Sequence, residues 1–118
     1  MARTQKTFAF ILGIILLLVG ILGFIENPLV GEGSPFGTNT IQDVLHLIAG
    51  AAGIYAGTKG TGKGYNLTIG WIGLTLGILG FIPGIDALLG TYLSINTEIT
   101  ILHLVIGLVS LGVGYKAK

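Results

Sequence analysis

The chain has 118 residues, of which 52% are hydrophobic, 9% are charged and 21 are glycine. This composition excludes an ordinary soluble globular domain and predicts a membrane protein. The absence of cysteine excludes disulfides, thiolate metal sites and cysteine nucleophiles, and a net charge of +1 gives no reason to expect a nucleic-acid partner.

Four apolar runs follow one another along the chain, at residues 8–25, 41–57, 65–82 and 99–115. Each holds about 17 to 18 residues, which as an α-helix is roughly 26 Å long and close to the ~30 Å hydrocarbon core of a bilayer. The first run is long for a signal peptide and no A-x-A cleavage site follows it, so we expect it to be retained as a helix. The sequence therefore predicts an all-α protein, an integral membrane four-helix bundle that forms a single domain over residues 1–118.

The connections between the runs differ in composition. The first and third, residues 26–39 and 83–96, combine Pro and Gly with scattered apolar residues, so we expect them to fold against the membrane surface. Within the third, residues 86–95 predict a short helix that is either interfacial or re-entrant. The second connection, residues 58–64, is a glycine-rich turn.

The charged residues are segregated along the chain. Every base lies before the first run, between the second and third, or after the fourth, and every acid lies in or beside the other two connections. The positive-inside rule then places both termini in the cytoplasm and the acidic connections outside. We therefore expect a multi-pass protein of a prokaryotic inner membrane with an N-in, C-in topology. The bases are Arg3, Lys6, Lys59, Lys63, Lys116 and Lys118, and the acids are Glu26, Glu32, Asp43, Asp86 and Glu98.

An internal repeat divides the chain into two halves. Aligning residues 8–57 with residues 65–114 needs no gap, and 17 of the 50 aligned positions carry the same residue. Each half contains two apolar runs, so the repeat predicts two tandem helical hairpins. Because both hairpins start on the same side, we expect a pseudo-twofold axis along the membrane normal.

Both halves carry an Asn-Thr pair immediately before the second helix of the hairpin. Side chains of these types accept hydrogen bonds from the free amide groups at a helix N-terminus. In the first half, Thr40 followed three residues later by Asp43 matches a capping box. The predicted cap residues are Asn39, Thr40, Asp43, Asn96 and Thr97.

Small residues recur along one face of each predicted helix, at separations that return to nearly the same angle. In a bilayer, close backbone approach at small residues is a main source of helix association. We expect these stripes to form the bundle interior or an interface between protomers. They comprise Gly13, Gly20 and Gly23 in the first run, Gly50, Gly53 and Gly57 in the second, Gly70, Gly73, Gly77 and Gly80 in the third, and Gly107 and Gly114 in the fourth.

His46 and His103 lie on these stripes, each inside a Leu-His-Leu segment and two helical turns from the predicted cap. An ionisable group inside a membrane is a candidate functional residue. We expect the two to be equivalent and buried, with each neutral ring bonded to a neighbouring helix or loop. The alternative is axial ligation of haem b or chlorophyll by both imidazoles. All six bases lie on the opposite side from the histidines, which counts against haem because its propionates commonly meet Arg or Lys.

Two segments carry a resemblance to a known family: NTIQDVLHLIAG, which starts at Asn39, and GLTLGILGFIPG, which starts at Gly73. They resemble a bacterial family of small four-span membrane proteins known only as a domain of unknown function, in which Asn-containing segments precede Leu-His-Leu-x-x-Gly helices. The resemblance covers residues 8–115. It implies a four-helix fold and no activity.

We therefore expect a non-enzymatic structural or assembly component, embedded in lipid, that self-associates or serves as an accessory subunit of a larger membrane complex. No nucleophile, base and orienting group can be combined into a catalytic site, and neither a metal nor a cofactor is expected. The first alternative is a porphyrin-binding electron-transfer or pigment protein. The second is a small channel or transporter, although the helices offer an ion few ligands beyond Asn, Thr, Ser and His.

Overall fold

The computed structural model describes residues 2–31 and 34–116, and these residues form five α-helices and no β-strand. The expected all-α class is therefore confirmed. Glu32 and Lys118, two of the charged residues used to predict the topology, lie outside the described residues. The helices are α1 (Ala2–Gly23), α2 (Thr40–Thr58), α3 (Lys63–Leu79), α4 (Ile85–Leu93) and α5 (Thr97–Lys116).

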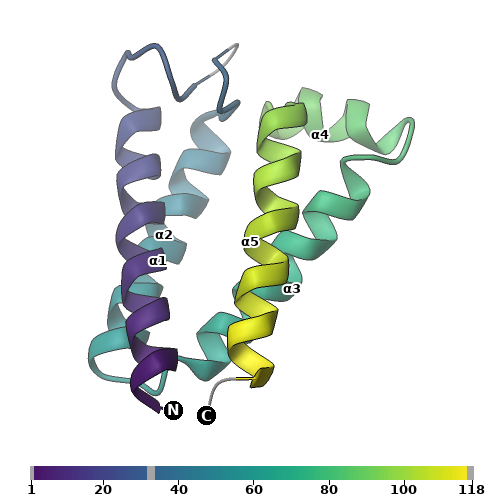
Figure 1. The fold of residues 1–118 in the computed structure, drawn as a ribbon. Helices are drawn as coiled ribbons and strands as arrows, with labels where there is room; N and C mark the ends of the chain where they lie inside the picture. Colours follow the sequence, from purple (N-terminus) through teal and green to yellow (C-terminus); the bar gives the residue numbers. More distant parts are fainter. Residues whose placement is uncertain (1, 32–33, 117–118) are drawn as a thin grey trace.

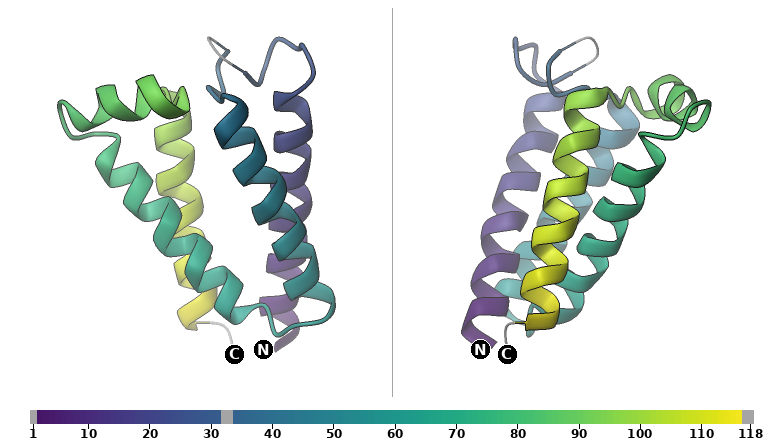
Figure 2. Two further views of the ribbon diagram at one scale, coloured as in Figure 1. Left: turned by 180° about the vertical axis from the view of Figure 1, so that it is seen from behind. Right: turned by 45° about the vertical axis from the view of Figure 1, so that its right-hand side comes forward.

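The four long helices form two antiparallel hairpins that lie side by side, α1 with α2 and α3 with α5 (Figure 1). The short helix α4 connects α3 to α5 and occupies most of the segment predicted to form a short helix. Both chain termini and the turn between α2 and α3 lie at one end of the molecule, called here the termini end (Figure 2). Residues 24–39 and α4 lie at the opposite end, called the loop end.

Two helical segments, Arg3–Gly23 and Thr97–Lys116, are long and apolar enough to cross a membrane, judged by length and composition. They belong to different hairpins, so each hairpin contains one such segment. Their partners in the hairpins are α2, with 19 residues, and α3, with 17 residues.

Local chemistry explains where the second hairpin begins and ends. Gly62, the residue before α3, has a φ of 84°, which glycine adopts without strain. A Cβ added there would lie 2.5 Å from the carbonyl oxygen of Gln5, so the same residue also lets α1 pass close to the turn. At the other end of α3, Pro83 cannot continue a helix, and the chain turns into α4.

The glycine stripes bring the two helices of each hairpin together. A Cβ added at Gly13 would lie 2.6 Å from the backbone nitrogen of Ile54, and one added at Gly50 would lie 2.5 Å from that of Leu17. In the second hairpin, a Cβ at Gly77 would lie 2.8 Å from the Cα of Leu104. The same kind of close approach to the other helix of the hairpin occurs at Gly20, Gly23, Gly53, Gly57, Gly70, Gly73, Gly80, Gly107 and Gly114.

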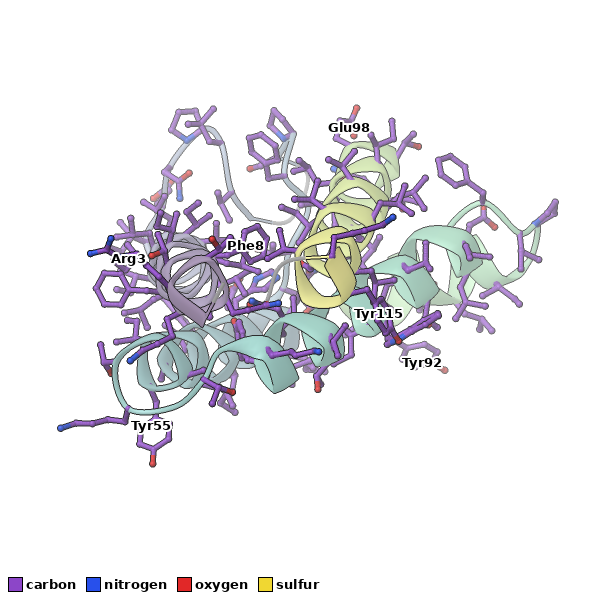
Figure 3. The ribbon with its side chains drawn as sticks, turned by 60° about the horizontal axis from the view of Figure 1, so that its bottom comes forward. Arg3, Phe8, Tyr55, Tyr92, Glu98 and Tyr115 are labelled. Atoms are coloured by element: carbon purple, nitrogen blue, oxygen red, sulfur yellow. The ribbon has the colours of Figure 1, made fainter. Side chains whose placement is uncertain are left out.

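The distribution of polar and apolar side chains is the reverse of that in a soluble protein. Large apolar side chains cover the outer faces of the hairpins, and Tyr55 and Tyr92 point away from the helices (Figure 3). Among the described residues, the buried apolar side chains are Ala9, Leu12, Val30, Ile95 and Ile99. The buried polar and charged side chains are Gln5, Thr38, Gln42, Asp43, Asn66, Thr100 and Ser110.

Candidate functional site

Two asparagines join the hairpins at the loop end. Asn39 donates a hydrogen bond from Nδ2 to the carbonyl oxygen of Tyr92 (2.7 Å), and Asn96 donates from Nδ2 to the carbonyl oxygen of Pro35 (3.0 Å) and to that of Ser34 (2.9 Å). Residues 39 and 96 differ by 57 positions, as do residues 35 and 92, so the two halves of the chain hold each other by equivalent bonds.

The same asparagines cap their own helices with the oxygen of the side-chain amide. Asn39 Oδ1 accepts from the backbone N–H of Gln42, and Asn96 Oδ1 accepts from that of Ile99, both at 3.0 Å. The predicted capping box of Thr40 and Asp43 is therefore wrong. The oxygen of Asn39 already occupies the first turn of α2, and Thr40 is exposed, as is Thr97, the first residue of α5.

Asp43 turns away from the cap and toward α1. Its carboxylate lies against Gly23, where an added Cβ would collide with the carboxylate atoms, and only 2% of the residue is exposed. Its Oδ1 has no hydrogen-bond partner among the described residues. Thr100, which lies 57 positions further along the chain, packs in the same way against Gly80, so a glycine admits the side chain in both hairpins.

The two histidines occupy equivalent places in the two hairpins, His46 on α2 and His103 on α5, and both are half-buried. His46 follows Asp43 by one helical turn, so both side chains lie on the same face of α2. The Nδ1 atoms of both rings are buried and have no hydrogen-bond partner among the described residues. The expected bond from each ring to a neighbouring helix or loop is thus not made through Nδ1.

Two further buried polar atoms without a partner lie at the loop end, on Gln42 and Thr38. Gln42 donates from Nε2 to the carbonyl oxygens of Leu93 (2.8 Å) and Gly37 (3.1 Å), which ties the residues before α2 to the end of α4. Its Oε1, and the Oγ1 of Thr38, are buried without a partner in the described part of the chain. The loop end therefore holds several buried polar atoms that have no partner among the described residues.

A cavity of about 110 Å³ lies at the loop end, among the end of α3, α4 and the start of α5. Its lining includes Asp86 on α4 and Thr100 on α5, and Thr100 lies one helical turn before His103. A larger cavity, of about 530 Å³, lies at the termini end and is lined by Arg3 and Lys6 together with Thr7, Phe10 and Gly57. Within residues 2–31 and 34–116, no group of three or more His, Asp or Glu side chains is arranged to hold a metal ion.

A second polar junction joins the hairpins at the termini end. Asn66 on α3 is fully buried, and its Nδ2 donates to the backbone oxygen of Gln5 (3.0 Å) and to Oε1 of Gln5 (2.8 Å). Gln5 in turn donates from Nε2 to the carbonyl oxygen of Val113 on α5 (2.8 Å). Between the two ends, the hydroxyl of Tyr65 donates to the carbonyl oxygen of Ala49 on α2 (2.7 Å).

Sequence reasoning missed Gln5, Gln42, Asn66 and Tyr65, all of which bond across the hairpins. The sequence did contain a signal for Gln42 and Asn66, because each is an amide side chain within an apolar segment. Asn66 lies four residues before Gly70, on the small-residue face of α3, and Gln42 lies four residues before His46.

One family model, described as a domain of unknown function (DUF4383), matches residues 6–115. No curated protein and no solved structure matches the chain.

Proposed function

The chain belongs to the DUF4383 family, a domain of unknown function, and on that premise we propose that it is a four-span membrane protein with a non-enzymatic structural or assembly role. In this proposal α1, α2, α3 and α5 cross a prokaryotic inner membrane, and the chain consists of two tandem hairpins, residues 8–57 and 65–114. The family membership expected from the sequence is confirmed, and the family description assigns no activity.

The observation that carries this proposal is the exposure of apolar side chains around a polar and glycine-rich interior. Ile48 on α2 is 62% exposed and Trp71 on α3 is 52% exposed, whereas Asn66 and Ser110 are fully buried. A soluble monomer rarely exposes large contiguous apolar areas, because each buried Å² of apolar surface contributes about 25 cal/mol. In a bilayer the same side chains face lipid at no such cost.

The ends of the helices support the proposed N-in, C-in topology. Arg3 and Lys6 lie at the start of α1, Lys59 and Lys63 flank the turn between α2 and α3, and Lys116 ends α5. All of these elements meet at the termini end, so the described bases share one side (Figure 1). The positive-inside rule assigns that side to the cytoplasm.

A cysteine at position 59 should react with a membrane-impermeant maleimide only after the cells are opened. The reason is that Lys59 lies at the termini end, and the chain has no other cysteine to react. Labelling of intact cells and of inverted vesicles, followed by a gel-shift assay, measures this. The matched control is Glu98→Cys, exposed at the loop end, which should react from outside. Labelling of Lys59→Cys in intact cells would contradict the proposed topology.

The assembly role rests on the exposed apolar faces and not on the glycines. The glycine stripes are occupied by the other helix of the same hairpin, so they do not remain available to a partner. A second copy of the chain, or the helices of a larger membrane complex, would instead meet side chains such as Leu18, Ile48 and Leu108, each more than half exposed.

Protein purified from native membranes in mild detergent should elute with a second copy or with other membrane subunits. Size-exclusion chromatography with light scattering, and mass spectrometry of the peak, measure the stoichiometry. The same sample tests the porphyrin alternative, in which His46 and His103 are the axial ligands. A monomer without companions would contradict the assembly role, and a Soret band lost in His46→Gln and His103→Gln would establish the alternative.

A further inference from the structure

We propose that the cavity at the termini end binds the headgroup of an anionic phospholipid from the surrounding membrane. The cavity has a volume of about 530 Å³, and it is lined by Arg3, Lys6, Thr7, Phe10 and Gly57. Pockets for small ligands commonly have volumes of about 300 to 1,000 Å³, so its size suits a headgroup. This inference goes beyond the assembly role, and it rests on the four-span arrangement because that arrangement places the termini end at a membrane surface.

The cavity is formed by one face of α1 and by a missing side chain on α2. Its lining residues on α1 recur at the separations that keep side chains on one side of a helix. On α2, Gly57 contributes no side chain, and a Cβ added there would lie 2.6 Å from the Cβ of Phe10 and 2.7 Å from the carbonyl oxygen of Lys6. The two helices therefore touch at Gly57, and the space beside this contact stays open.

The cavity is positively charged, and no described acidic side chain lies near it. Arg3 and Lys6 line it, whereas the other three bases among the described residues do not. Arg3 also lies in the first turn of α1, where the helix dipole disfavours a cation. An anion bound in the cavity would therefore compensate both bases. The described acids lie at the opposite end of the helices: Glu26, Asp43, Asp86 and Glu98.

The order of the lining residues along α1 suits a lipid better than a free anion. Arg3 and Phe10 are seven residues apart, which is about 10 Å along a helix. In the proposed topology the two bases lie at the membrane surface and Phe10 lies deeper, so acyl chains below a bound phosphate would pass over the exposed ring of Phe10. Figure 3 shows Arg3 pointing away from the second hairpin, on the side of α1 that lipid would cover.

The chemistry of the side chains favours a phosphate with a net negative headgroup. A guanidinium group forms paired hydrogen bonds with phosphate oxygens, an ammonium group adds a point charge, and the hydroxyl of Thr7 is a further donor. Basic pockets on the cytoplasmic side of membrane helices bind anionic headgroups in this way. A zwitterionic lipid carries the same phosphate, but its cation would meet Arg3 and Lys6. The proposed ligand is therefore an anionic lipid such as phosphatidylglycerol.

Native mass spectrometry of the full chain in mild detergent, titrated with phosphatidylglycerol, tests the proposal. We expect phosphatidylglycerol to bind about tenfold more tightly than phosphatidylcholine, because the bases attract a net negative headgroup. Arg3→Gln combined with Lys6→Gln should weaken the binding of phosphatidylglycerol by about tenfold or more, since both bases are lost. Glycerol phosphate, which has no acyl chains, should not displace the lipid at the same concentration.

Lys59→Gln combined with Lys63→Gln is the matched control. It removes two bases from the same end of the molecule, but neither lines the cavity, so the affinity should change by less than about twofold. Equal losses in the two double variants would overturn the proposal, because only the overall charge of the termini end would then matter. Equal binding of both lipids, or displacement by glycerol phosphate, would also overturn it.

Two further measurements keep the test decisive. Arg3 is exposed, so Arg3→Gln alone decides if the double variant does not fold, and a loss of about threefold or more is then expected. An unchanged affinity in that variant would contradict the site. The labelling at position 59 fails or succeeds separately, so it distinguishes a wrong topology from a wrong site.

Discussion

Gly107→Ala should destabilise the protein by about 1 to 3 kcal/mol, the usual cost of forcing an extra methyl group into a closely packed contact. An added Cβ would overlap the backbone nitrogen of Leu74 on α3 and would lie 2.8 Å from the carbonyl carbon of Gly73. These are backbone atoms, so no side chain can rotate away, and α3 and α5 must separate. Unfolding by sodium dodecyl sulfate, followed by circular dichroism of the protein in mixed micelles, measures the change.

Gly112→Ala provides the matched control on the same helix. Nothing lies within 4 Å of a Cβ added at Gly112, so alanine there should stabilise α5 by about 0.5 to 1 kcal/mol through its higher helix propensity. The two variants differ in position and not in chemistry. Equal stability of Gly107→Ala and the unmodified protein would show that α3 and α5 do not pack through this contact.

Asn66→Asp should give the second large loss, again about 1 to 3 kcal/mol and more where the carboxyl stays ionised. The change keeps the shape of the side chain but replaces the Nδ2 donor by an acceptor. That acceptor would face the backbone oxygen and the Oε1 of Gln5, which now accept from Asn66 at 3.0 Å and 2.8 Å. Because Asn66 is fully buried, water cannot take the place of the lost donor.

Thr68→Ala is the control for this change, measured in the same unfolding assay. Thr68 is exposed on α3, and its hydroxyl bonds only within the helix, to the carbonyl oxygen of Gly64, so the expected effect is below about 0.5 kcal/mol. If Asn66→Asp unfolds at the same detergent fraction as Thr68→Ala, the amide junction does not hold the hairpins together.

The helices could be predicted because hydropathy and helix-breaking residues act locally. The four apolar runs correspond to α1, α2, α3 and α5, and the largest difference is at α1, which begins at Ala2 although the apolar run begins at residue 8. The polar residues before the run continue the helix because helix formation does not require apolar side chains. A smaller difference occurs at the C-terminal end of α3. This helix ends at Leu79, before the third apolar run ends, because the chain turns ahead of Pro83.

The candidate site was only partly predictable. The repeated Leu-His-Leu segments pointed to His46 and His103, and the Asn-Thr pairs pointed to the helix starts. The assignment of the cap to Thr40 and Asp43 failed because a capping box and a single Asn cap have overlapping sequence patterns, and only the direction of the side chains separates them. The direction of Asp43 depends on the space left by Gly23, which lies on another helix.

The sequence by itself determined the all-helical class, the positions of the long helices and the small-residue faces along which they pack. These features follow from the order of residues within one helix, where spacing fixes the angle of each side chain. Only the tertiary structure decided that each Asn links its own helix to the other half and that Gln5 meets Asn66. These contacts join residues more than 50 positions apart, so they depend on how the hairpins pack and not on any pattern within a helix.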